Sequence, residues 1–168
     1  MHFDGCHTLT LVLADVDVTA FEPQLREMAA RGIAFATLAE EQQREPEWLA
    51  RFCELENETR RGIDAPRSVE QMRERLAFLK VVPEALFLAK LGDRYVGYTC
   101  LNVAESDADC LIQGWTGVRP EYQRQGIGTA LKMLGITYAK QHGYRAIVTT
   151  PRVTNTASIR MSLKVGFR

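Results

Sequence analysis

The chain has 168 residues, of which 46% are apolar and 25% charged, and its 21 basic residues balance its 21 acidic ones. This length fits one domain, and the composition is typical of a soluble globular protein. With no net charge and no apolar run long enough to span a membrane, we expect neither nucleic acid nor a membrane as a partner. The four cysteines, Cys6, Cys53, Cys100 and Cys110, show no paired ligand spacing, so we expect reduced thiols, a cytoplasmic protein and no metal site.

The first half of the chain alternates between strand and helix patterns. Leucines at every second position predict a strand, apolar residues at helical spacing predict helices, and Ser68 with Gln71 forms a capping box at a helix start. The expected elements are a strand over 7–14, a helix over 21–30, a strand over 33–38, a helix over 48–55 and a helix opening at 66–68.

The second half predicts an antiparallel meander followed by a strand–helix–strand unit. Its strands are expected over 86–90, 95–103 and 110–118, then a helix over 127–140, a strand over 146–150 and a helix over 155–165. Because such crossover units are right-handed, the strand over 146–150 should run parallel to the strand over 110–118.

The most informative stretch is the turn between that third strand and the helix, which carries Gly126 and Gly128. A glycine-rich turn at a helix start exposes backbone N–H groups that suit a phosphate, and we expect glycine there because a Cβ would block a phosphate oxygen. Arg124 adds a fixed positive charge.

Two common phosphate-binding motifs do not fit this turn. A P-loop needs Lys-Ser or Lys-Thr after its last glycine, but Thr129 and Ala130 follow Gly128. A dinucleotide-binding turn needs an acidic residue about 20 positions further on, and none occurs from Tyr122 to Arg168. What remains is a pyrophosphate bound by a strand–turn–helix without a carboxylate for the ribose.

The turn resembles the signature of the GCN5-related N-acetyltransferase (GNAT) family, Gln/Arg-x-x-Gly-x-Gly/Ala, which reads Gln123-Arg124-Gln125-Gly126-Ile127-Gly128 here. The preceding strand end, Thr116-Gly117-Val118-Arg119-Pro120, and the later Asn155 and Gly166-Phe167 extend the resemblance over about residues 33–168. It implies the α/β acyl-CoA N-acyltransferase fold, a mostly antiparallel mixed sheet flanked by helices, whose two central parallel strands splay apart.

The resemblance also implies acetyl-CoA as cosubstrate. Backbone N–H groups from Gln125 to Thr129 would hold its pyrophosphate, and the strand end would pair with its pantetheine arm. The implied cofactor-binding residues are Thr116, Gly117, Val118, Gln123, Arg124, Gln125, Gly126, Ile127, Gly128, Thr129 and Asn155. Phe52, Tyr98 and Trp115 are expected to line the acceptor cleft beneath the early helices.

The sequence departs from the family pattern at three places. Ser162 stands where many members have the Tyr that protonates the leaving thiolate, and it is our candidate catalytic residue. Gln113 and Thr116 occupy the strand on which a Glu often serves as base. The last strand is expected to be missing, with Thr8–Ala14 covering the open edge; residues 1–32 would form an extension and residues 33–168 the acetyltransferase domain.

The predicted function is transfer of acetyl from acetyl-CoA to a primary amine of a small molecule or peptide. The alternative is a non-catalytic acyl-CoA-binding or structural domain of a paired acetyltransferase. Two protein partners stay open, a second copy of the chain and a second acetyltransferase domain.

Overall fold

The computed structural model describes residues 8–79, 81–105 and 107–168; the predicted strand residue His7 and the thiol of Cys6 lie outside them. Within this part of the chain, six strands form one mixed sheet in the order β1-β6-β5-β4-β3-β2. The strands are β1 (Leu9–Val12), β2 (Ile33–Thr37), β3 (Leu86–Leu91), β4 (Arg94–Ala104), β5 (Asp107–Val118) and β6 (Ala146–Thr149).

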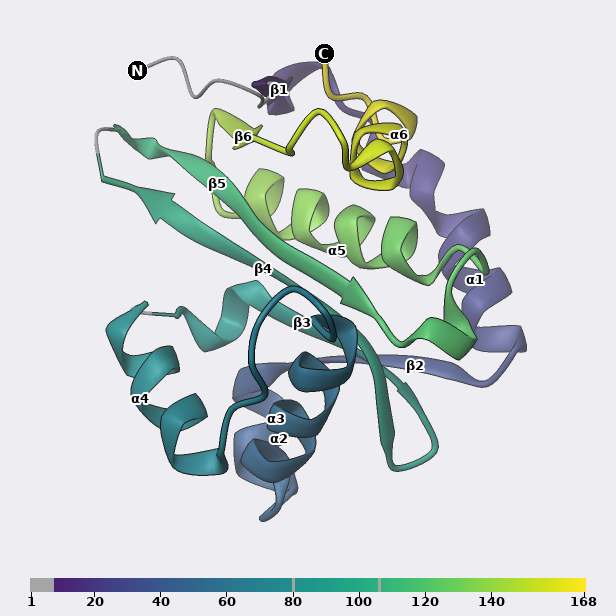
Figure 1. The fold of residues 1–168 in the computed structure, drawn as a ribbon. Coiled ribbons are helices and arrows are strands. Elements are labelled where there is room, and N and C mark those ends of the chain that lie inside the picture. The colour runs from purple at the N-terminus through teal and green to yellow at the C-terminus, as the bar shows by residue number, and fades with distance from the viewer. Residues whose placement is uncertain (1–7, 80, 106) are drawn as a thin grey trace.

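Helices cover both faces of the sheet (Figure 1). Helices α1 and α5 lie on one face, with α6 beside α5, and α2, α3 and α4 lie on the other. Their bounds are α1 (Glu22–Ala30), α2 (Leu38–Arg44), α3 (Trp48–Thr59), α4 (Val69–Phe78), α5 (Ile127–Gln141) and α6 (Thr156–Lys164). Among the described residues, no helix has both the length and the apolar character needed to cross a membrane.

Strands β5 and β6 pair only briefly before they separate. The parallel register joins Cys110 to Ala146 and ends where Ile112 meets Val148. From Gln113 to Val118, β5 pairs with β4 alone. The predicted parallel pair and its splay are therefore both confirmed, and from Gln113 to Val118 one edge of β5 has no strand partner among the described residues.

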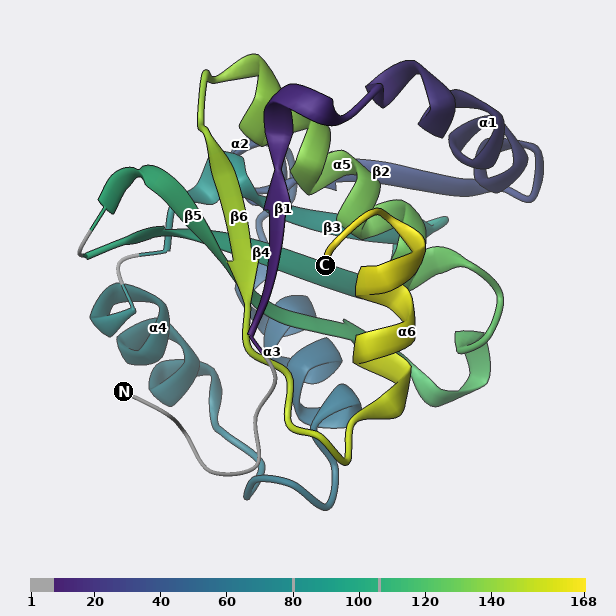
Figure 2. The ribbon, with the colours of Figure 1, turned by 90° about the horizontal axis from the view of Figure 1, so that it is seen from above.

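The first strand covers the outer edge of β6, as the sequence led us to expect. β1 runs antiparallel to β6, from Leu9 opposite Thr149 to Val12 opposite Ala146. Figure 2 shows β1 and β6 side by side, with the C-terminal segment close by. That segment pairs with β1 through Thr10 and Arg168, whose amides donate to each other's carbonyls at 2.7 and 3.0 Å.

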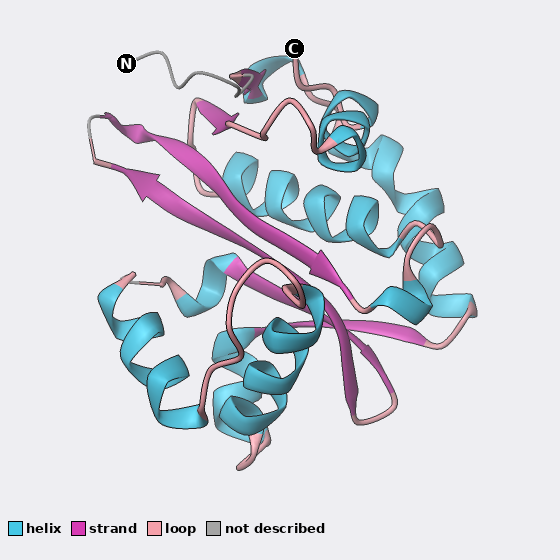
Figure 3. Cartoon of the chain, viewed as in Figure 1, coloured by secondary structure: helices cyan, strands magenta, loops and turns pink. Residues whose placement is uncertain are grey.

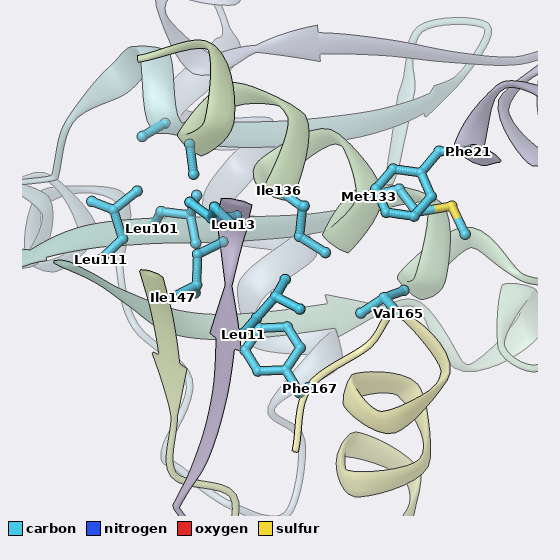
Figure 4. Close-up of a cluster of buried hydrophobic side chains, with 12 residues drawn as sticks. Leu11, Leu13, Phe21, Leu101, Leu111, Met133, Ile136, Ile147, Val165 and Phe167 are labelled. Atoms are coloured by element: carbon cyan, nitrogen blue, oxygen red, sulfur yellow. The ribbon is translucent and has the colours of Figure 1, made fainter. Parts of the chain in front are cut away.

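The hydrophobic core on the α5 face joins the two ends of the chain. Leu11 of β1 and Phe167 pack together with Ile147 of β6 and Ile136 of α5 (Figure 4). Each of these four side chains is almost wholly buried. Residues 8–32 are thus built into the same sheet and core as the rest of the protein.

Most predicted elements are confirmed to within a few residues, as the colouring by secondary structure in Figure 3 shows. The exception is α2, which the sequence analysis missed. Its signal was present, because Thr37 accepts from the Glu40 amide while the Glu40 side chain accepts from the Thr37 amide, which is a capping box.

Candidate functional site

The turn between β5 and α5 is held in shape by glutamine side chains. Gln123 Nε2 donates to the Val118 carbonyl at 3.0 Å, and Gln125 Nε2 donates to the Glu121 carbonyl at 3.1 Å. Arg124 and Gly126 both have positive φ, 59° and 86°, a conformation that glycine accepts easily and arginine rarely adopts. The turn therefore has a fixed and partly strained backbone.

Arg31, at the end of α1, braces this turn from outside. Its guanidinium donates to the Gln125 carbonyl at 2.8 Å and to Gln125 Oε1 at 2.7 Å. The sequence analysis did not single out Arg31, and no local pattern could have done so because the contact joins distant parts of the chain.

The amide groups of this turn are free to donate to a ligand. In the described chain, no amide from Arg124 to Thr129 donates a hydrogen bond, and the first bond of α5 runs from the Ala130 amide to the Gly126 carbonyl. No side chain caps α5, and its first turn holds no acidic residue. Free amides and the positive end of the helix dipole suit a pyrophosphate, so the residues present fit the phosphates of acetyl-CoA.

Both glycines of the turn have close neighbours on other helices, in addition to the expected requirement for phosphate access. A Cβ at Gly126 would lie 2.6 Å from Gln24 Nε2 of α1, and a Cβ at Gly128 would lie 2.7 Å from Met161 Sδ of α6. A side chain at either position would therefore have to displace the flexible side chain of Gln24 or Met161. The positive φ at Gly126 adds a second requirement.

The C-terminal part of β5 leaves its backbone edge open toward α6. Thr116 pairs with Thr99, Gly117 with Tyr98 and Val118 with Gly97 on β4, while the opposite edge has no strand partner in the described chain. Such an edge can pair with an extended ligand as a further strand would. The open edge leads directly to the turn at the start of α5, so the unpaired strand edge and the free turn amides are continuous along the chain.

Gln113, at the position where a base was sought, has a structural role. Its Nε2 donates to Thr99 Oγ1 and to the Cys100 carbonyl, both at 2.9 Å. Of the acidic residues near the start of β5, Asp107 pairs with Arg145. These contacts do not identify a general base among the carboxylates of the described residues.

The predicted catalytic Ser162 and the predicted contact Asn155 both lie on α6. Asn155 caps the helix by accepting from the Ser158 amide at 3.1 Å. Ser162 is fully buried, and its Oγ has no hydrogen-bond partner among the described residues. A buried hydroxyl without a partner is uncommon and leaves a donor available to a ligand.

Lys132 of α5 is a buried cation that the sequence analysis missed. Only 1% of the residue is exposed, and its Nζ lies 5.7 Å from the centre of the Phe167 ring. The part of the chain that the structure describes provides neither an ion pair nor a hydrogen bond for this amine. Burial lowers the pKa of Lys132 from 10.5 to about 8. The sequence did contain one indication of this buried lysine, because Lys132 lies among the apolar residues of the predicted helix.

The other face of the sheet is rich in paired charges. The buried Arg119 donates from Nε to the Tyr95 carbonyl at 2.7 Å and forms ion pairs with Glu54, at 3.2 Å, and Glu58 of α3. Glu41 accepts from Lys90 Nζ at 2.8 Å and from Tyr95 Oη at 2.6 Å.

These contacts settle the ionisation of Glu41. Burial of the Glu41 carboxyl favours its neutral form, but the hydrogen bonds from Lys90 and Tyr95 outweigh that effect and hold its pKa below the usual value. The α2–α3 side of the sheet is thus held together by satisfied charges.

The three aromatic residues expected in the acceptor cleft do lie on this face. Phe52 and Tyr98 meet edge to face with ring centres 5.2 Å apart, and the Arg60 guanidinium stacks 3.9 Å above Trp115. Tyr98 Oη and Trp115 Nε1 are buried without a hydrogen-bond partner among the described residues. They leave two polar groups between β4–β5 and α3 for a ligand to satisfy.

Comparison with known proteins identifies the family. The sequence model of the acetyltransferase (GNAT) family matches residues 47–167, so the chain belongs to that family. A sequence comparison with curated proteins gives no significant match.

Solved structures of this fold resemble the chain at low sequence identity. A GCN5-related N-acetyltransferase from Sphaerobacter thermophilus matches with a TM-score of 0.67 and 18% identity, over 97% of this chain and 47% of its own. A putative acetyltransferase from Salmonella typhimurium, solved with acetyl-CoA, matches with a TM-score of 0.64 and 18% identity, over 82% and 80% of the two chains.

Diaminobutyrate acetyltransferase from Paenibacillus lautus, solved with its substrate and coenzyme A, matches with a TM-score of 0.59 and 22% identity, over 79% and 73% of the chains. The chain therefore spans about half the length of the Sphaerobacter protein and most of the other two. At these identities the likeness establishes the fold, and the acyltransferase fold class expected from the sequence is confirmed.

Proposed function

We propose that this protein is an acetyl-CoA-dependent N-acetyltransferase that transfers acetyl directly to a primary amine of a small molecule or peptide. One observation carries the proposal: the free amides from Arg124 to Thr129 continue directly from the open edge of β5. A diphosphate on the turn would place an extended arm along that edge, in the gap between β5 and β6. The complexes of the Salmonella and Paenibacillus proteins with acetyl-CoA and coenzyme A support the choice of cosubstrate.

The residues of this chain would act chiefly by binding and orientation. Amides of Gln125 to Thr129 and the Arg124 guanidinium hold the phosphates, and backbone groups of Thr116 to Val118 hold the arm. Bound acetyl-CoA supplies an activated acetyl thioester. The acceptor approaches from the α3 side, past Tyr98 and Trp115, and proximity to the thioester accounts for much of the rate.

The acceptor amine must be neutral when it attacks. An amine with a pKa near ~10.4 is almost wholly protonated at pH 7, so it needs a base or a water relay. Gln113 cannot accept a proton at neutral pH, and the contacts of β5 offer no carboxylate in its place. We therefore favour an acceptor whose amine has a low pKa or is deprotonated by water.

The proposal is tested by measuring coenzyme A release from acetyl-CoA with a library of amines and short peptides. Release with any amine, with acetylation of that amine confirmed by mass spectrometry, supports the enzyme. Calorimetric titration with coenzyme A in parallel measures cofactor binding separately. A folded protein that does not bind coenzyme A would contradict the proposal at its first step.

A non-catalytic acyl-CoA-binding or structural domain is the second candidate. The structural use of Gln113 and the presence of Ser162 in place of an acidic phenol favour it. Tight coenzyme A binding without turnover of any amine would select this candidate. We further propose a cytoplasmic location, and either a second copy of the chain or a second acetyltransferase domain as protein partner.

A further inference from the structure

We propose that Lys132 is a catalytic residue which faces the cofactor sulfur and donates a proton to it as the thioester breaks. The inference rests on the proposed function and assigns a residue to the step for which Ser162 is a weak candidate. Lys132 faces the sheet beside β5, and it has no counter-ion among the described residues.

Residues one helical turn away show where Lys132 faces. Gly128, four residues before it, faces Met161 of α6 and Val118 of β5, and Gly135, three residues after it, faces Leu101 of β4. Positions three and four apart share a helix face, so Lys132 faces the sheet beside β5 and α6, where its Nζ lies 5.7 Å from the centre of the Phe167 ring. This side of α5 also meets Val118, at the edge of β5 that has no strand partner among the described residues.

The position of Lys132 along α5 suits the far end of the cofactor arm. Six residues separate Gly126 from Lys132, which is about 9 Å along the helix axis. The phosphates would lie at the start of α5, and the arm leads away from them along β5. Lys132 therefore lies beyond the phosphates, beside the stretch of β5 toward which the thioester extends.

Among the described residues, no counter-ion lies within ion-pair distance of Lys132. The charged residues of the neighbouring elements are exposed or engaged elsewhere: Arg160 and Lys164 of α6 and Asp109 of β5 are exposed, Asp107 of β5 and Arg119, which follows β5, have partners, and Lys140 of α5 donates to the Val16 carbonyl. Burial raises the pKa of the Cys100 thiol of β4 to about 11, so Cys100 is neutral at pH 7 and supplies no counter-charge to Lys132. A buried cation without a partner destabilises a fold, so its presence points to a partner that arrives with the ligand.

The chemistry balances with one proton from Lys132. The acceptor nitrogen forms a bond to the acetyl carbon, the carbon–sulfur bond breaks, and its electron pair leaves with sulfur. The Lys132 ammonium gives a proton to that sulfur, which leaves as a thiol. The acetylated nitrogen loses its extra proton to water, and neutral Lys132 takes up a proton from water.

The amine suits this role better than the Ser162 hydroxyl does. A proton donor works best when its pKa lies near the working pH, and burial brings the pKa of Lys132 to about 8, close to that of an ordinary thiol. A serine hydroxyl gives up a proton far less readily. Ser162 Oγ, buried on α6, remains able to donate a hydrogen bond.

The test measures the ionisation of the coenzyme A thiol while it is bound, by its thiolate absorbance over a pH range. Wild type is compared with Lys132→Met, Lys132→Arg and the control Lys164→Met, which removes an exposed lysine of α6. Desulfo-coenzyme A binding, by calorimetry, shows whether each variant keeps its cofactor site. Lys132→Gln replaces Lys132→Met should that variant fail to fold.

We expect the pKa of the bound coenzyme A thiol to be at least one unit lower in wild type and in Lys164→Met than in Lys132→Met. We expect desulfo-coenzyme A affinity to stay within about threefold, and acetyl transfer at pH 7 to fall at least tenfold, the low side of general acid effects. Lys132→Arg should keep the low thiol pKa but lose transfer, because arginine retains its proton.

Identical thiol ionisation in wild type and Lys132→Met would overturn the inference. A low thiol pKa that depends on Lys132, in a protein that acetylates no amine, would support the contact and contradict the proposed enzyme. Failure of wild type to bind coenzyme A would contradict the proposed function, and the inference with it.

Discussion

Arg119 and Lys132 lie on either side of the turn, each only 1% exposed, but their surroundings are opposite. Arg119, on the α3 side, has the Tyr95 carbonyl and two glutamates as partners. Lys132, on the α5–α6 side, has neither a carboxylate nor a carbonyl within bonding distance among the described residues. Two equally buried cations therefore differ in role. Arg119 links α3 to the end of β5 through its ion pairs, whereas Lys132 is a buried charge without an ion pair or hydrogen bond among the described residues.

The largest change in stability should come from removing Arg119, the buried cation that has ion-pair partners. Arg119→Met removes the partner of Glu58 and of the buried Tyr95 carbonyl, so the free energy of unfolding should fall by about 3–5 kcal/mol. Denaturant unfolding followed by circular dichroism measures this change. Arg94→Met, which removes a half-exposed arginine paired with Glu121, is the control and should change stability by less than about 1 kcal/mol. Equal losses in the two variants would contradict a structural role specific to Arg119.

Lys132→Met should change stability in the opposite direction from Arg119→Met. It should raise the free energy of unfolding at pH 7 by about 1–3 kcal/mol. The gain should depend on pH. Between about pH 8 and 10.5 the folded protein has released the Lys132 proton while the unfolded chain still holds it, so wild-type stability gains from rising pH in that window. The difference between variant and wild type should therefore shrink from pH 8 upward. Unfolding curves at pH 7, 9 and 10.5 check this, and a variant less stable than wild type at pH 7 would contradict it.

Arg124 is a third cation to compare with these two: it has no ion-pair partner in the described chain, as Lys132 has none, but it is exposed. Its removal should leave stability unchanged and weaken coenzyme A binding about tenfold or more, since a charged hydrogen bond contributes roughly 1.5–3 kcal/mol. Pantetheine, which lacks the phosphates, should bind Arg124→Ala and wild type equally. Calorimetry with both ligands measures this, and equal losses for the two would assign Arg124 to the structure of the turn.

The smallest effects should come from substitutions at two glycines whose backbone has positive φ. Gly126→Ala and Gly143→Ala both place a Cβ on a residue with positive φ, so each should lower stability by about 1–2 kcal/mol. Only at Gly126 does the Cβ meet a neighbour, Gln24, whereas at Gly143 nothing lies within 4 Å. Coenzyme A affinity should therefore fall in Gly126→Ala alone. Unchanged affinity in that variant would show that the turn tolerates displacement of Gln24.

The sequence predicted the parts of this molecule that depend on local pattern. Alternation and helical spacing located the strands, and the glycine pair located the turn and the start of α5. The gap between β5 and β6 followed from the family resemblance. Each of these features is encoded by neighbouring residues, which is why one sequence sufficed.

The parts that were missed depend on contacts between distant residues. Arg31 reaches the turn only because α1 packs beside α5, and Gln24 and Met161 come close to Gly126 and Gly128 only in the folded chain. The lack of an ion-pair partner for Lys132 can be recognised only when the positions of the charged residues around it in the fold are known. Spacing within a sequence cannot reveal that a charge lacks a partner.

The pairing of β1 with β6 has a consequence for how this protein is made. The strand that covers β6 is synthesised well before its partner, because more than a hundred residues lie between Val12 and Ala146. Until then Leu11 has neither Ile147 nor Phe167 to pack against, and the hydrogen-bonding edge of β1 is unpaired. Pairing of such distant segments is slow, because a long loop must close before any contact forms. The sheet can therefore be completed only after residues 146–149 have been translated, and until then the unpaired edge of β1 is exposed to pairing with a wrong strand.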